Sequence, residues 1–221
     1  MTALTIEVLL DPDAVAERAA AYVAERANVA VADHGRFTFA VSGGRTPWAM
    51  FARLAGQMPW KNVRLYQVDE RIAPDGDPSR NLTHLRSSLP PGASADVRAM
   101  PVSASDLEAA AAEYARSLPE SFDLIHLGLG PDGHTASLVP GDPVLTVTDR
   151  DVALTGDYQG QRRMTLTYRK INTARQVLWL VTGKDKVDAL ERLRAGDRSI
   201  PAGQVEAESQ LVIADSAATG R

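Results

Sequence analysis

The sequence predicts an α/β fold: one doubly wound, mostly parallel sheet with helices on both faces. Short runs of β-branched and aromatic residues alternate with longer segments whose apolar residues recur at helical spacing. Several strands end in a short polar or glycine-containing loop, an arrangement typical of sheets that bind ligands at their carboxyl edge. The 221 residues contain no internal repeat, low-complexity tract or long linker, so residues 1–221 are interpreted as a single domain.

Composition excludes several classes of protein. Hydrophobic residues make up 44% and charged residues 24%, and the net charge of −4 argues against a nucleic-acid partner. No apolar run approaches the roughly 20 residues that span a bilayer, and Met1–Leu10 lacks the basic start of a signal peptide, so we expect a cytoplasmic protein without membrane contact. The absence of cysteine excludes disulfides and thiolate chemistry, and the four histidines lack metal-ligand spacing. We expect neither a metal nor a cofactor.

The elements follow in chain order from local signals. Asp11 is a candidate N-cap and Pro12 a first-turn proline for a helix over Ala14–Ala32, and Pro47 opens a second helix over Trp48–Gly56. The other predicted helices are Ser79–Leu89, Ser105–Leu118 and Asp185–Leu193. The predicted strands are Thr5–Leu10, Arg36–Val41, Val63–Val68, Val97–Met100, Phe122–Leu127, Val152–Leu154, Met164–Thr167, Val177–Thr182 and Leu211–Ala214.

A glycine-containing loop joins the second predicted strand to its helix. Its residues are Ser42, Gly43, Gly44, Arg45 and Thr46. Two glycines allow close approach of the backbone to an anion, and free N–H groups at a helix start favour a phosphate. The loop matches neither the Walker A nor the Gly-x-Gly-x-x-Gly pattern, so no nucleotide is implied. An ordinary tight turn between strand and helix is the alternative.

Asp69-Glu70-Arg71 follows the strand Val63–Val68, and we expect it to form a short polar loop. The guanidinium of Arg71 offers a fixed set of donors for a carbonyl or phosphate oxygen, and Asp69 could orient it or bind substrate hydroxyls. A solvated charge cluster at the end of a strand is the alternative, and for these residues taken alone we favour it.

His134 is the candidate general base. It follows Gly130-Pro131-Asp132-Gly133, a turn of defined shape, and it precedes Thr135–Leu138, where we expect a short helix to begin. A helix N-terminus disfavours the protonated imidazole, and a neutral imidazole is what a base requires. The alternative is a structural histidine that caps the turn.

Basic residues near two other strands complete the candidate site. Lys184 and Lys186 follow the strand Val177–Thr182, in the first turn of the next predicted helix, where a cation is unfavourable unless an anion lies nearby. Arg163 precedes the strand Met164–Thr167 and adds charge. Exposed side chains are the alternative for each. His126, inside an apolar strand, is interpreted as a core or edge residue.

Together these motifs resemble the 6-phosphogluconolactonase family, within the superfamily that includes glucosamine-6-phosphate isomerase. The matching segments run in the family's order over about residues 36–190. They are Ser42-Gly43-Gly44-x-Thr46-Pro47, Asp69-Glu70-Arg71, Asn81, Asp123-Leu124, Gly128–Leu138, Arg163–Thr167, Ile171-Asn172 and Thr182-Gly183-x-x-Lys186. Two features depart from the family. Val68 stands where a glycine is common, and Thr155–Arg162 replaces a proline-rich stretch.

The resemblance implies a Rossmann-like fold of the sugar-phosphate isomerase type and hydrolysis of 6-phospho-D-glucono-1,5-lactone in the pentose phosphate pathway, with a functional link to glucose-6-phosphate dehydrogenase. It implies His134 as the base, Asp132 as the residue that sets its turn, and Arg71 with Asp69 or Glu70 at the carbonyl. The implied substrate-binding residues are Ser42, Gly43, Gly44, Arg45, Thr46, Gly130, Arg163 and Lys186.

Two other functions remain as alternatives. A glucosamine-6-phosphate deaminase resembles this chain up to His134 but usually continues Ile-Ala-Phe-Asn-Glu, and that glutamate is missing after Thr135-Ala136-Ser137. A non-catalytic sugar-phosphate sensor would usually carry an added DNA-binding domain, for which this chain has no spare length.

Overall fold

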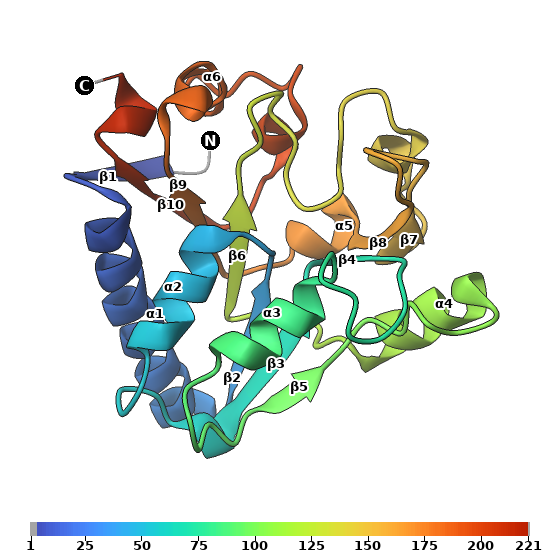
Figure 1. Cartoon of the computed structure of the whole chain (residues 1–221), viewed down its shortest axis with the longest axis horizontal. Helices are drawn as coiled ribbons and strands as arrows, with labels where there is room; N and C mark the ends of the chain where they lie inside the picture. The colour runs from blue at the N-terminus through green and yellow to red at the C-terminus, as the bar shows by residue number, and fades with distance from the viewer. Residues whose placement is uncertain (1–3, 221) are drawn as a thin grey trace.

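The computed structural model describes residues 4–220. Its centre is a seven-stranded sheet in which every neighbouring pair of strands is parallel (Figure 1). The strands are Leu4–Leu9 (β1), Phe37–Val41 (β2), Val63–Gln67 (β3), Asp96–Arg98 (β5), Leu124–Gly128 (β6), Gln176–Val181 (β9) and Ser209–Asp215 (β10). They lie in the order β1-β10-β9-β6-β2-β3-β5, so the predicted doubly wound parallel sheet is confirmed.

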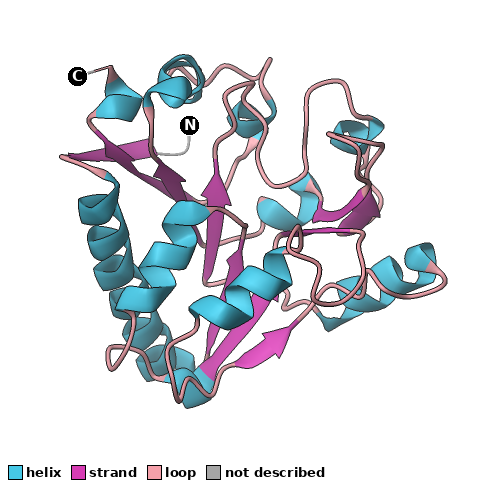
Figure 2. Ribbon diagram, in the orientation of Figure 1, coloured by secondary structure: helices cyan, strands magenta, loops and turns pink. Residues whose placement is uncertain are grey.

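Helices cover both faces of this sheet. They are Pro12–His34 (α1), Arg45–Arg53 (α2), Asn81–Ser88 (α3), Leu107–Ser117 (α4), Tyr168–Ile171 (α5) and Val187–Arg194 (α6). Figure 2 shows α1, α2 and α3 together over one face, and these three helices share a core with β2, β3 and β6. Helices α4 and α6 contribute to a second core on the other face. Within residues 4–220, no helix combines the length and the apolar character needed to cross a membrane.

The central strands are apolar because both of their faces are buried. Successive side chains point to opposite faces of the sheet. On β6, Leu124 enters the core shared with α1, α2 and α3, whereas Ile125 and Leu127 enter the other core. His126 therefore points to the same face as Leu124.

A second sheet, of three antiparallel strands, was not predicted. Its order is β4-β8-β7, with Asp69–Arg71 as β4, Arg163–Leu166 as β8 and Val152–Leu154 as β7. The prediction that the three charged residues form a loop is therefore wrong, because they pair with β8 in the register Asp69↔Thr165 and Arg71↔Arg163. This pairing brings Arg71 beside Arg163.

The point where the chain reverses its direction of winding fixes the place of a ligand site. Strands β2 and β6 are neighbours, yet the chain continues from β2 towards β3 and β5, and from β6 towards β9 and β10. Their carboxyl ends diverge there and leave a crevice, the usual ligand position in an open α/β sheet. The loop Ser42–Gly44 and the turn around His134 both start at this crevice.

Candidate active site

The segments that follow β2, β6 and β9 surround a cavity of about 280 Å³ at the carboxyl edge of the parallel sheet. Strands β4 and β8 contribute residues to the same cavity. Asp132, predicted as a site residue, does not line the cavity and contacts His134 instead. The other predicted site residues all line it: Ser42, Gly43, Gly44, Arg45, Thr46, Asp69, Arg71, Gly130, His134, Arg163 and Lys186.

The glycine loop presents the start of α2 to the cavity. Gly44 is the N-cap of α2 and has a φ of 139°, in the region that favours glycine. A Cβ on Gly43 would lie 1.9 Å from Oδ1 of Asn81, so the backbone there has no room for a side chain. The Oγ1 atoms of Thr46 and Thr182 lie 2.9 Å apart and link this loop to the end of β9. The N–H groups of a first helical turn lack intrahelical partners and favour an anion.

The cavity is basic, although the whole chain has a net charge of −4. Burial lowers the pKa of Arg163, and the negative charge of Asp69 partly opposes this effect. Lys186 makes an ion pair with Asp185, with 3.0 Å between Nζ and Oδ2. Lys184, the other lysine considered from the sequence, does not line the cavity. The basic residues that line it are Arg45, Arg71, Arg163 and Lys186.

His134 is held by Asp132. Its Nδ1 lies 2.6 Å from Oδ1 of Asp132, and the same oxygen accepts the His134 backbone N–H at 3.1 Å. Burial raises the pKa of Asp132, but the His134 backbone N–H and imidazole outweigh burial, so this pKa is lowered from its ordinary value. An ionised Asp132 holds the imidazole proton on Nδ1 and leaves Nε2 as the acceptor.

The expectation of a helix after His134 is wrong. Thr135 and Leu138 form an isolated antiparallel bridge, and Ala136 between them has a φ of 51°. The Thr135 hydroxyl donates to the Gly128 carbonyl at 2.8 Å and ties the turn back to β6. The segment after His134 therefore supplies no helix dipole, and the charged side chain that contacts the imidazole is Asp132.

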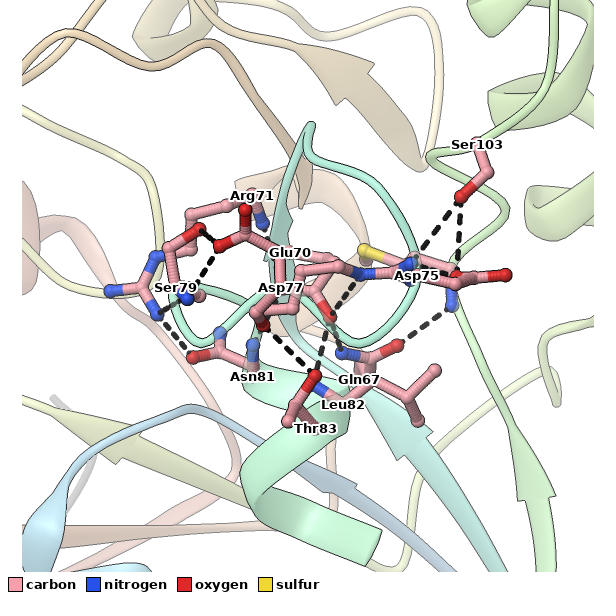
Figure 3. Close-up of polar contacts among 12 residues, drawn as sticks. Gln67, Glu70, Arg71, Asp75, Asp77, Ser79, Asn81, Leu82, Thr83 and Ser103 are labelled. Atoms are coloured by element: carbon pink, nitrogen blue, oxygen red, sulfur yellow. Dashed lines mark hydrogen bonds and ion pairs between the residues drawn. The ribbon is translucent and has the colours of Figure 1, made fainter.

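The guanidinium of Arg71 is hydrogen-bonded to Asn81 (Figure 3). Its Nη1 donates to Oδ1 of Asn81 and, at 3.1 Å, to the Ser79 carbonyl. The Asn81 amide in turn donates to the Asp69 carbonyl at 3.0 Å. The same amide lies 3.4 Å from Oδ1 of Asp69. The expected orientation of Arg71 by Asp69 or Glu70 therefore runs through Asn81, without a direct hydrogen bond from the guanidinium to either carboxylate within residues 4–220.

Glu70 has a structural role. Its side chain is fully buried, and it accepts the backbone N–H groups of Arg71, Asn81 and Leu82 at 2.8, 2.7 and 2.8 Å. The N-cap residue of α3, Arg80, makes no side-chain cap bond. Glu70 therefore stabilises the start of α3 and with it the position of Asn81.

Three residues near the cavity were not among the predicted site residues. Asn81, quoted only as part of the resemblance, lines the cavity and holds Arg71. His126 also lines it, although its side chain is completely buried. The Tyr158 hydroxyl donates to Oδ2 of Asp132 at 3.3 Å. Asn81 belongs to the segments that match the family, so the sequence contained a signal for it. No sequence signal connected Tyr158 to Asp132, 26 residues earlier.

The family model described as glucosamine-6-phosphate isomerases/6-phosphogluconolactonase matches residues 10–213. The chain belongs to this family. A 6-phosphogluconolactonase of Synechocystis is 36% identical over 94% of this chain and 93% of its own length. The human GDH/6PGL endoplasmic bifunctional protein is 37% identical over 71% of this chain and 22% of its own length. A crystal structure of 6-phosphogluconolactonase from Thermotoga maritima has a TM-score of 0.85 and 28% identity, and covers 97% of this chain and 100% of that one.

The two departures from the 6-phosphogluconolactonase pattern have clear positions in the structure. Val68 is buried and bridges the sheets, because its N–H donates to Val41 at 3.1 Å and its carbonyl accepts from Leu166 at 2.8 Å. Residues 155–162 form a hairpin that contains Tyr158, whose hydroxyl contacts Asp132. Arg163, directly after the hairpin, keeps its place on the cavity wall.

Proposed function

We propose that this protein hydrolyses 6-phospho-D-glucono-1,5-lactone to 6-phospho-D-gluconate, a step of the pentose phosphate pathway. The observation that carries the proposal is His134, hydrogen-bonded to Asp132 at the edge of a cavity rich in cations. The curated relatives named 6-phosphogluconolactonase, one of them 36% identical over nearly the whole chain, support it.

In this proposal the phosphoryl end of the substrate binds at the glycine loop. The N-terminus of α2, Arg45 and Lys186 supply positive charge, and the hydroxyls of Ser42 and Thr46 supply donors. Fixing the phosphate also fixes the lactone ring at the other end of the molecule, which lowers the entropic part of the barrier.

The chemical step is an acyl transfer to water. His134 Nε2 takes a proton from a water molecule as its oxygen adds to C1, and Arg71 and Arg163 stabilise the negative charge that develops on the carbonyl oxygen. The bond between C1 and the ring oxygen then breaks, and the imidazolium returns the proton to that oxygen. The products are a free hydroxyl and a carboxylic acid, which ionises.

The alternatives predict different products. A glucosamine-6-phosphate deaminase would release ammonia, and the missing glutamate after Ser137 argues against it. A sugar-phosphate sensor would bind without turnover, and the hydrogen-bonded pair His134–Asp132 gives no reason to favour it.

One assay separates these functions. The purified protein is mixed with lactone freshly made from glucose 6-phosphate, and the rate of lactone loss is measured with spontaneous hydrolysis subtracted. We expect a large enzymatic excess and no ammonia from glucosamine 6-phosphate. A rate equal to the spontaneous one would overturn the proposal, and ammonia release would establish the deaminase.

We further propose that residues 1–221 act as one catalytic domain and that the function is linked to glucose-6-phosphate dehydrogenase. The human relative, whose name joins GDH and 6PGL in one bifunctional protein, supports such a link. The cytoplasm stays a prediction for the location of the reaction.

A further inference from the structure

The hairpin over residues 155–162 is a well-defined structure. Tyr158 and Gln161 exchange backbone hydrogen bonds at 3.1 and 3.3 Å, and Gln159 and Gly160 between them have φ values of 55° and 78°. Two successive positive φ values are those of a type I′ turn, the two-residue connection that fits the twist of paired strands. Gln161 also donates to the Ser79 hydroxyl at 3.1 Å. The turn therefore holds Tyr158 in a fixed position.

Tyr158 contacts the proposed catalytic groups in three ways. Its hydroxyl donates to Oδ2 of Asp132 at 3.3 Å, while Oδ1 of the same carboxylate receives His134 Nδ1 at 2.6 Å. Its ring meets the imidazole edge to face, with the centroids 5.6 Å apart. The guanidinium carbon of Arg163 also lies over this ring, 5.0 Å from its centroid. One side chain thus contacts the base, the partner of the base and a cation of the cavity wall.

These contacts restrict the movement of the imidazole. Asp132 fixes Nδ1, but a carboxylate held by one oxygen is free to rotate about its own axis. The Tyr158 hydroxyl takes the second oxygen, and the aromatic contact restricts the tilt of the imidazole ring. Catalytic groups keep a productive geometry only when such supporting contacts lock them.

We propose that Tyr158 is a positioning residue, which holds the Asp132–His134 pair with Nε2 directed at the cavity. This inference rests on the proposed function, because it assigns His134 as the base. Tyr158 acts through Asp132 and His134 and needs no contact with the substrate. Its place in the sequence is the segment where this chain departs from the family's proline-rich stretch.

The test is Tyr158→Phe, which removes the hydroxyl and keeps the ring against His134 and Arg163. We expect kcat to fall about three- to tenfold, the loss of one hydrogen bond, with KM little changed. The midpoint of the pH–rate profile should rise. Without the Tyr158 hydrogen bond, the Asp132 carboxylate keeps more negative charge and stabilises a protonated imidazole more strongly. The other charged groups that line the cavity are untouched: Arg45, Asp69, Arg71, Arg163 and Lys186.

Tyr22→Phe is the matched control, because it removes a tyrosine hydroxyl that donates to Gln176 at 2.9 Å outside the cavity lining. An NMR titration of the His134 imidazole in wild type and Y158F gives a readout that needs no turnover. Unchanged kcat and an unchanged His134 titration in Y158F would overturn the assignment of Tyr158. A wild-type protein inactive on the lactone, with a His134 titration that still shifts in Y158F, would instead overturn the proposed function alone.

Discussion

At the residue scale, His126 is a buried polar side chain on an apolar strand. It is completely buried on β6, and neither ring nitrogen has a hydrogen-bond partner among residues 4–220. Its neighbours in the sheet register are Val41 on β2 and Leu178 on β9. A buried polar group without a partner loses its hydration and regains nothing, which costs about 1–3 kcal/mol.

His126→Leu is therefore expected to increase the free energy of unfolding by about 1–3 kcal/mol at pH 7. Chemical denaturation with urea measures this change. The control is His84→Gln, which replaces an exposed histidine on α3. A variant less stable than wild type would show that His126 has a favourable partner after all.

The same histidine makes stability depend on pH. Burial lowers its pKa from 6.5 to about 3 in the folded protein. Between these two pH values the unfolded chain binds more protons at this position than the folded one. The free energy of unfolding should thus fall as the pH drops from about 6.5 towards 3, by up to about 1.4 kcal/mol per pH unit, and His126→Leu should remove this share. Equal slopes for wild type and H126L would contradict the account.

At the element scale, the fit between the glycine loop and α3 determines where Arg71 lies. A Cβ on Gly43 would overlap the Asn81 side-chain oxygen at 1.9 Å, and that oxygen receives the Arg71 guanidinium. Three segments therefore meet at one contact point: the loop after β2, the start of α3 and strand β4. Glu70 accepts backbone N–H groups from β4 and from α3 and so anchors both.

Gly43→Ala should displace Asn81 and release Arg71. A shift of about 1 Å in a catalytic group is enough for a loss of the order of a hundredfold in kcat/KM. Asn81→Ala should cause a similar loss, and the double variant G43A/N81A should be no worse than the more impaired single variant, because both changes remove the same contact. Additive losses in steady-state kinetics would show that Gly43 acts by another route.

The elements that sequence predicted well are those whose pattern is local. β7 spans the predicted residues Val152–Leu154, and β2 and β9 differ from the prediction by one residue at one or both ends, because continuous apolar runs report burial on both faces. α1 was marked by its cap, where Asp11 accepts the Ala14 N–H at 2.8 Å. α6 begins at Val187, two residues later than predicted, because Lys184–Lys186 form a 3₁₀ turn first.

The missed elements depend on distant partners. β4 consists of three charged residues and is a strand only because β8, more than 90 residues later, pairs with it. The turn after His134 resembles a helix start in sequence, but Ala136 adopts a positive φ that ends any helix. The contact of Tyr158 with Asp132 likewise depends on a hairpin whose position no local signal gives.

At the scale of the whole molecule, the winding of the sheet brings the site together. The loops after β2, β6 and β9 are far apart in sequence, yet they meet because parallel strands present their carboxyl ends at one edge. This part of the site could be predicted from the alternation of strands and helices alone. The wall made by β4 and β8 could not, because it belongs to a sheet built from long-range antiparallel pairing.

The positive charges of the cavity also come from segments that are far apart in the sequence. The chain carries a net charge of −4, while Arg45, Arg71, Arg163 and Lys186 come from four separate segments to line one cavity. Cations collected in a cavity attract an anionic ligand more strongly than the net charge suggests. The sugar phosphate proposed as substrate has a negatively charged phosphate at one end and an electrophilic carbonyl at the other.

We have proposed His134 as the base of a lactone hydrolase. The most direct measurement is the steady-state rate of His134→Asn on freshly generated 6-phospho-D-glucono-1,5-lactone, with spontaneous hydrolysis subtracted and His84→Gln as the control. We predict a fall in kcat of about 10²–10⁴ with little change in KM, because general base catalysis is lost and the cationic cavity is kept. A variant H134N that retains the wild-type kcat would contradict the account.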